Sequence, residues 1–189
     1  NKWIMRYHSL LRKLATEKIE KGKYKNLLKL GYFEGNYNFK KLQVVSSFAL
    51  VGRLTNDDLL KETAKRQIFL AIKFQRDDGY FFTDVYNVKK DYARSNVQFL
   101  CIEFMNAYFN IKGAFNNQEK LRFKQAIQKS LKYVIGYISP FTEVNQLAGA
   151  LLLMRMYNIE FGGFQKEYYL FKKNLLDQQL PNGEWYEKW

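Results

Sequence analysis

The sequence predicts an all-α protein built from αα-hairpin repeats, and three observations favour that fold class. The 189 residues include only two prolines, Pro140 and Pro181, and both fall in expected connections, so the apolar segments are free to be helical. Apolar residues recur at helical spacing, and no segment shows the sustained alternation typical of a strand. A short motif around a glycine also returns at intervals of about fifty residues, which indicates a repeated unit.

Two kinds of helix are expected to alternate along the chain. Three segments are apolar nearly all round, and each is followed by an amphipathic, charged segment. A helix that is apolar on every side must be surrounded by protein, whereas an amphipathic helix covers it from outside. We therefore expect inner and outer helices to alternate as stacked αα-hairpins. The expected inner helices are Leu42–Leu54, Val97–Phe109 and Gln146–Tyr157, and the expected outer helices are Asp57–Gln75, Gln118–Ile138 and Phe164–Gln179.

The recurring motif places an acidic residue or Asn before a glycine and an aromatic residue two positions after it. It occurs as EGNY at 34–37, DGYF at 78–81 and NGEW at 182–185. In the last two copies a glutamine, Gln75 or Gln179, ends the preceding apolar run. Glycine adopts the left-handed backbone angles that end a helix, and a preceding Asp or Asn assists it. We expect the motif to end each outer helix and its aromatic side chain to wedge between adjacent hairpins.

The charge of the chain favours an acidic partner. The formal net charge is +13, and residues 1–41 hold eleven Lys or Arg against three Glu. Such a field attracts acidic polysaccharide, nucleic acid or an anionic membrane surface. Nucleic acid ranks lower, because the chain lacks a compact basic and aromatic motif of the RNA-recognition type. Lysines that only solvate the outer helix faces would give the same composition.

Several kinds of site are excluded by residue counts. The single cysteine, Cys101, leaves no internal disulfide and no cysteine metal cluster, and the single histidine, His8, leaves no site that needs two imidazoles. We expect a buried structural thiol, a structural histidine, no metal and no cofactor. No apolar run reaches the roughly 18 residues of a membrane span, so none is expected. Residues 1–189 are expected to form one helical-repeat, toroid-like domain, and a start at Asn1 suits a processed protein or a piece of a longer chain.

The pattern Gln, two to four residues, Asp or Asn, Gly, any residue and an aromatic resembles that of (α/α) toroids, over roughly residues 33–189. The segment FTEVNQLAGALLLMRMYN, from Phe141, followed by LLDQQLPNGEW is most similar to the toroidal domain of uronic-acid polysaccharide lyases of the heparinase II/III type. A weaker resemblance links the motif to the QW repeats of terpenoid cyclases. Those cyclases use an Asp-x-Asp-Asp cluster, of which this chain has only Asp77 and Asp78. The resemblance identifies an architecture that unrelated chemistries share.

The resemblance to the lyases implies particular site residues. An Asn at the start of an inner helix binds the substrate carboxylate in those lyases, which makes Asn145 the first candidate and Asn96 the second. The lyases also use a Tyr or His as base and acid, and Tyr80, Tyr86 or Tyr92 could serve here. A glycosidase would instead need two carboxylates beside a groove. The candidates for such a pair are Asp77, Asp78, Asp84, Glu143 and Glu184.

The connections from outer to inner helices all emerge at one end of a toroid, so their residues are expected to converge around its mouth. The longest connection, Arg76–Arg94, lies there, and long loops on rigid scaffolds commonly hold ligand contacts. We predict Asp78 and Tyr80 as catalytic residues. The predicted substrate-binding residues are Asn145, Asn96, Arg94, Asp77, Trp185 and Tyr37.

The sequence therefore predicts a carbohydrate-active toroid domain that acts on or binds an acidic polysaccharide or oligosaccharide. If it is an enzyme, it is a polysaccharide lyase or glycoside hydrolase, located outside the cell or in the periplasm. The alternative is a non-catalytic helical-repeat scaffold that binds a polyanion or a partner protein, and a terpenoid-cyclase-like toroid ranks third. About fifty residues per hairpin give fewer hairpins than a closed toroid has, so further domains of the same chain are expected partners.

Overall fold

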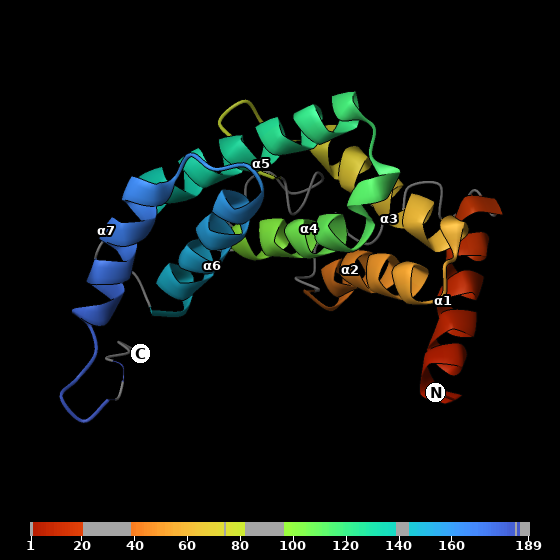
Figure 1. Cartoon of the computed structure of the whole chain (residues 1–189), viewed down its shortest axis with the longest axis horizontal. Coiled ribbons are helices and arrows are strands. Elements are labelled where there is room, and N and C mark those ends of the chain that lie inside the picture. Colours follow the sequence, from red (N-terminus) through yellow and green to blue (C-terminus); the bar gives the residue numbers. More distant parts are fainter. Residues whose placement is uncertain are drawn as a thin grey trace, which may run out of the picture.

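A computed structural model describes residues 2–20, 39–73, 75–81, 97–138, 144–183 and 185. These residues form seven α-helices and one short 3-10 helix, so the prediction of an all-α protein is confirmed (Figure 1). The elements are α1 (Lys2–Glu20), α2 (Phe39–Leu54), α3 (Asp58–Lys73), α4 (Val97–Ile111), η4 (Lys112–Ala114), α5 (Asn117–Tyr137), α6 (Val144–Glu160) and α7 (Gln165–Leu176).

The helices after α1 lie in two layers. Helices α2, α4 and α6 pack against one another in that order, and α3, α5 and α7 cover them from one side (Figure 1). Helix α1 packs against α2 and α3 at one end of the arrangement. The segments expected to be inner and outer helices therefore match the two layers, with boundaries that differ by a few residues.

Helix α4 lies at the centre and carries most of the core. Ten of its 15 residues are buried, as expected for a helix that is apolar on every side. Its Tyr108 ring stacks on Phe123 of α5 with centroids 4.7 Å apart, and Phe115 and Phe161 pack around this pair. Large aromatic side chains bury more apolar area than any others, so this cluster is a main source of stability.

Helices α3 and α5 bury one face each, and the two faces have identical spacing. Both helices bury six residues that follow one another at intervals of three, one, three, one and three positions. That spacing places all six on a single stripe of an α-helix. The stripe of α3 is Leu60, Thr63, Ala64, Gln67, Ile68 and Ala71, and that of α5 is Phe123, Ala126, Ile127, Ser130, Leu131 and Val134.

Helix α5 begins at a complete capping box. The side chain of Asn116 accepts a hydrogen bond from the Glu119 N–H at 2.9 Å, and the Glu119 carboxylate accepts one from the Asn116 N–H at 2.9 Å. Two of the N–H groups that no helical carbonyl can reach are thereby satisfied. Lys65 of α3 contacts the same carboxylate at 3.4 Å, which ties the start of α5 to its neighbour.

Polar contacts between helices join residues that lie 48 to 57 positions apart in the chain. One example is the Tyr108 hydroxyl, which donates to the Glu160 carboxylate at 3.1 Å and so joins α4 to α6. Another is Gln98 of α4, whose side-chain amide donates to that of Gln146 on α6. Helices about one hairpin apart in the chain are thus linked by side-chain hydrogen bonds.

Candidate functional site

The predicted glycine motif at 75–81 forms a closed turn directly after α3. Gln75 and Phe81 pair as an antiparallel bridge, and the Arg76 N–H donates to the Tyr80 carbonyl at 2.9 Å. The Gly79 N–H donates to the Arg76 carbonyl at 3.0 Å. These bonds reverse the chain within seven residues, so the motif ends the outer helix as predicted.

Gln75 and Ser130 lock this turn onto α5. The Gln75 side-chain amide lies 2.9 Å from the Ala126 carbonyl, 2.9 Å from Ser130 Oγ and 3.2 Å from the Gly79 carbonyl. The Ser130 hydroxyl is fully buried and donates to the Gly79 carbonyl at 2.7 Å. A helix carbonyl has two lone pairs, so Ala126 accepts this bond without losing its helical one. Sequence reasoning treated the glutamine as an end marker and missed this role, although its presence in two copies was a usable signal.

Two separate features of the turn require a glycine at position 79. Its φ angle is +97°, in the region that L-residues with a side chain rarely adopt. A Cβ on this residue would also lie 2.2 Å from the Lys129 carbonyl oxygen of α5, closer than any real contact. The turn therefore approaches α5 backbone to backbone, which only glycine permits.

Phe81 occupies the wedge position predicted for the motif aromatic. Its side chain is 1% exposed, and its ring meets Phe104 of α4 edge to face with centroids 5.7 Å apart. The turn thus contacts α5 through its backbone and α4 through this ring. Both contacts position the hairpin that contains α4 and α5 against α3.

Asp78 and Tyr80, predicted as catalytic, hold the turn in place. The Asp78 carboxylate accepts a hydrogen bond from the Tyr80 N–H at 3.0 Å and pairs with Arg76 at 2.8 Å. The Tyr80 side chain is buried, with its ring 5.5 Å from that of Tyr133, and the Arg76 guanidinium lies over it at 5.6 Å. Both side chains have structural contacts that account for them, and their catalytic role stays a prediction.

Of the remaining predicted site residues, Asp77 belongs to this turn, whereas Asn145 and Trp185 lie on other parts of the fold. Asp77 is fully exposed and lies 4.0 Å from Lys129. Asn145 is exposed on the first turn of α6, and Trp185 follows α7. Figure 1 shows the segment after α7 well away from the turn beside α5. Asn96, Arg94 and Tyr37 lie outside the described residues, as do Asp84, Glu143 and Glu184 and the tyrosines at 86 and 92.

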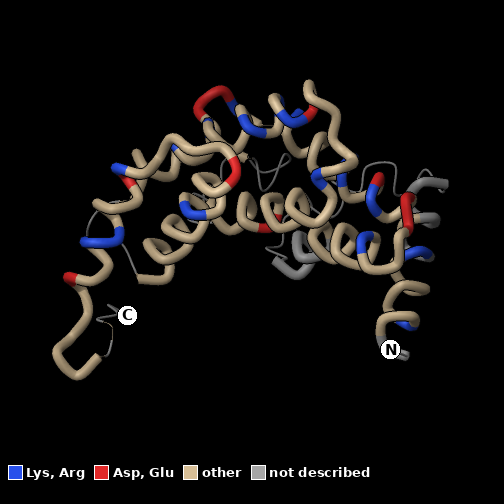
Figure 2. The backbone as a smooth tube through the Cα atoms, in the orientation of Figure 1, with Lys and Arg blue, Asp and Glu red and all other residues tan. Residues whose placement is uncertain are grey.

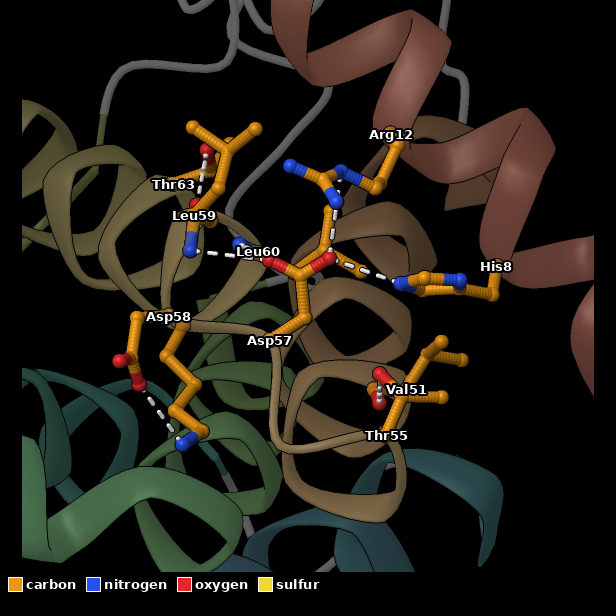
Figure 3. Close-up of polar contacts among 10 residues, drawn as sticks. His8, Arg12, Val51, Thr55, Asp57, Asp58, Leu59, Leu60 and Thr63 are labelled. Atoms are coloured by element: carbon orange, nitrogen blue, oxygen red, sulfur yellow. Dashed lines mark hydrogen bonds and ion pairs between the residues drawn. The ribbon is translucent and has the colours of Figure 1, made fainter.

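A second polar cluster, absent from the predicted site, surrounds Asp57 at the start of α3 (Figure 3). Its carboxylate accepts hydrogen bonds from the N–H groups of Leu59 and Leu60 at 3.0 and 3.3 Å and so caps the helix. The same carboxylate lies 2.7 Å from His8 Nε2 and 3.3 Å from Arg12 Nε, both on α1. One side chain thereby caps α3 and attaches α1 to it.

The Asp57 carboxylate is 8% exposed, and burial alone would raise its pKa. Hydrogen bonds from His8 and the Leu60 N–H, together with the charge on Arg12, lower the pKa by more, so the net shift is downward. The carboxylate is therefore held in its charged form. The cluster explains the single histidine as a structural residue, as expected from the sequence.

Cys101 is a buried structural thiol, as predicted. It lies on α4 with no exposed surface, and burial raises its pKa to about 12, an effect that a hydrogen bond with Ser130 reduces. The thiolate is the reactive form of cysteine, so a thiol with this pKa is inert at neutral pH.

Positive charge gathers on the outer layer, and α5 carries more of it than α3 or α7 does. Figure 2 shows Lys and Arg along α3, α5 and α7. Helix α5 has five Lys or Arg and one Glu among its 21 residues. Arg122, Lys129 and Lys132 are all exposed and follow one another at intervals of seven and three, so they share one solvent face of the helix.

Among the described residues, no group of three His, Cys, Asp or Glu side chains lies close enough together to hold a metal ion. None of the helices in that part of the chain is long and apolar enough to cross a membrane.

The described residues form an all-α fold of two helix layers, in which a glutamine and glycine turn after α3 docks onto α5. Comparison with protein-family models, with curated proteins and with solved structures finds no match for this chain.

Proposed function

We propose that this protein is an αα-hairpin repeat scaffold with toroid-like order, whose outer helix layer binds an acidic polysaccharide. The proposal has two parts, the repeat architecture and the ligand class. The observation that carries the ligand class is the exposed cationic face of α5, made by Arg122, Lys129 and Lys132.

Three features support the repeat architecture. The buried stripes of α3 and α5 have the same spacing, and polar contacts between helices span 48 to 57 residues. The turn at 75–81 also docks one outer helix onto the next through Gln75 and Gly79. Contacts confined to neighbouring units are the mark of stacked helical repeats.

Several features support binding to an acidic polymer. Arg122 and Lys132 lie ten residues apart on α5, which spans about 15 Å along the helix. Exposed Arg66 on α3 and Lys172 on α7 add positive charge on the neighbouring outer helices. A row of cations on one layer attracts a linear polyanion more strongly than the same charges scattered over the surface. Sulfate and carboxylate groups form charge-assisted hydrogen bonds with such side chains.

Lyase- or hydrolase-type action on the same polymer is the second candidate, and one face of α6 favours it. Asn145, Ala148, Leu152, Arg155 and Ile159 are all exposed and follow at intervals of three and four, so they share one stripe. An open stripe on an inner-layer helix leaves Asn145 accessible to a substrate carboxylate, as the resemblance to lyases implies. Arg155 supplies a cation on the same face.

Binding to heparin and to polygalacturonate, measured by calorimetry over a range of salt concentrations, tests both candidates. Reversing two cations of the outer face, Arg122→Glu with Lys132→Glu, is expected to weaken binding roughly tenfold, or about 1.4 kcal/mol. The matched control is Arg53→Glu with Arg155→Glu, which removes the same charge from exposed positions on α2 and α6. We expect this control to change affinity by less than about threefold.

The two variants separate the candidates. Equal losses in both would show that net charge alone attracts the polymer, which contradicts a binding face on the outer layer. A larger loss in the control would place the polymer on the inner layer and favour the lyase or hydrolase. An unsaturated product that absorbs in the near ultraviolet would establish lyase activity, and Asn145→Ala should then abolish it.

A further inference from the structure

The turn after α7 repeats the turn after α3 in both sequence and backbone. Gln179 and Trp185 pair as an antiparallel bridge, as Gln75 and Phe81 do. The Gln179 side chain donates to the Gly183 carbonyl at 3.0 Å, and the φ angle of Gly183 is +87°. The local structure is therefore complete without any neighbour.

The surroundings of the two turns differ. Gly79 is buried against α5, whereas a Cβ on Gly183 would meet no atom within 4 Å in the described part of the chain. Phe81 is 1% exposed, and the equivalent Trp185 is 38% exposed. The C-terminal copy thus has the geometry of a docked turn, and no described helix lies against its glycine.

The surface around the C-terminal turn is also more apolar than that of its twin. Leu180 stands where the first turn has Arg76, and Leu176, four residues earlier at the end of α7, is exposed as well. Tyr169 and Leu170, earlier in α7, are also exposed. Large exposed apolar side chains in and before this turn favour an interaction surface.

The internal turn shows what kind of helix such a turn accepts. On α5 the contact face consists of a small residue, Ala126, and a serine four positions later, Ser130. The small side chain leaves its carbonyl open to the glutamine amide, and the serine hydroxyl donates to the glycine carbonyl. We propose that the C-terminal turn, residues 179–185, docks an amphipathic helix of a partner protein that carries this small-x-x-x-Ser face.

A second copy of this chain does not offer such a helix. The pattern Ala or Gly, three residues and Ser occurs once in the sequence, at Ala126 and Ser130, and there the chain's own turn at 75–81 covers it. The matching positions on α3 are Thr63 and Gln67, and both are buried. Within residues 1–189 only α5 carries this face, so the occupant that fits the proposal is a helix of a partner protein.

The α5 sequence itself provides the probe. A fluorescent peptide of residues 117–137, acetylated and amidated, is titrated with the whole protein and followed by anisotropy. We expect saturable binding, and at least about tenfold weaker binding by the same peptide with Ala126→Leu and Ser130→Leu, which block the close approach. Peptide and protein are both basic, so work at high salt screens their repulsion and leaves no attraction through net charge.

Gly183→Asn in the protein is the matching receptor variant. Asn tolerates left-handed backbone angles, and no described atom lies within 4 Å of a Cβ on Gly183, so the fold should be retained. In the complex the new side chain would meet the docked helix as a Cβ on Gly79 would meet Lys129. We expect at least about tenfold weaker peptide binding, and about fivefold weaker binding for Gln179→Ala, with unchanged thermal unfolding.

Three results would overturn the proposal. The two peptides could bind equally well, or Gly183→Asn could bind like the wild type, and either would show that the turn is not the docking surface. Sedimentation could also show a dimer of the wild-type protein that Gly183→Asn abolishes, which would assign the surface to a second copy.

Discussion

The side-chain amide of Gln75 donates a hydrogen bond to the carbonyl oxygen of Ala126, 2.9 Å away and 51 residues later in the chain. This bond joins the end of one outer helix to the middle of the next. It recurs in no other described part of the chain, because the second glutamine, Gln179, has only its own turn to contact there. The two copies therefore form an internal comparison of docked and undocked turns.

Replacing Gln75 by Ala should destabilise the protein by about 2 kcal/mol, because Ala126, Ser130 and Gly79 lose a buried hydrogen-bond partner. The free energy of unfolding in urea measures the loss. Gln179→Ala is the matched control, and we expect it to change stability by less than about 0.5 kcal/mol, because Gln179 is exposed. Similar losses in both variants would show that the glutamine acts only within its own turn.

Substitution of Gly79 should likewise cost more stability than substitution of Gly183. Gly79→Ala combines a left-handed backbone with a Cβ placed 2.2 Å from the Lys129 carbonyl, so we expect a loss of about 3 kcal/mol or more. Gly183→Ala has the backbone strain alone and should lose about 1 to 2 kcal/mol. Urea unfolding at equal protein concentration compares them. A larger loss at Gly183 would contradict the close approach of the first turn to α5.

Asp57→Asn tests the cluster that attaches α1 to α3. Asn still caps a helix, so the variant removes the charge and leaves the cap. Because the pKa of Asp57 is lowered in the folded state, its charge stabilises the fold above the ordinary carboxyl pKa of 3.8. That contribution is lost as the pH falls below this value through the lowered folded pKa.

Wild type should therefore exceed Asp57→Asn in stability by about 2 kcal/mol near neutral pH, and the difference should shrink in acid. Urea unfolding of both proteins as a function of pH gives the difference directly. Asp58→Asn is the control, because this neighbouring carboxylate is 87% exposed and pairs only with Lys61 among the contacts described. A difference between wild type and Asp57→Asn that persists unchanged in strong acid would contradict the role of the charge.

Cys101 provides a probe of global opening. A pKa of about 12 leaves on the order of one thiol in 100,000 ionised at neutral pH, and no part of the side chain reaches solvent. A disulfide reagent that reports thiols by colour should therefore label the folded protein only at the rate at which it unfolds. In urea the labelling should be complete and fast. Rapid labelling of the folded protein would show that α4 is accessible, contrary to its central position.

Much of the fold could be predicted from the sequence because it depends on local patterns. Alternation of all-round apolar and amphipathic segments predicted the two helix layers, and the glycine motif predicted the left-handed turn and the buried Phe81. Both follow from which side chains can face water and which backbone angles a residue tolerates. The burial of Cys101 between apolar neighbours follows from the same reasoning.

The candidate site was less predictable, because polar residues carry no local signal of their partners. Asp78 and Tyr80 carry reactive groups, from which the sequence predicts a catalytic role, and the structure gives them contacts within the turn. Asp57 was seen only as the start of a helix, and its contacts with His8 and Arg12 depend on how α1 lies on α3. A residue 49 positions away cannot be identified as a partner from spacing alone.

Helix periodicity and glycine conformation act over a few residues, so the sequence was enough to predict the helical class, the alternation of layers and the turns at 75–81 and 179–185. What each of these two turns contacts depends on the packing of the whole chain. The same seven-residue motif is buried against α5 in one copy and exposed in the other. The physical reason is that docking depends on whether another helix lies within hydrogen-bonding distance, and that distance is a property of the packed chain.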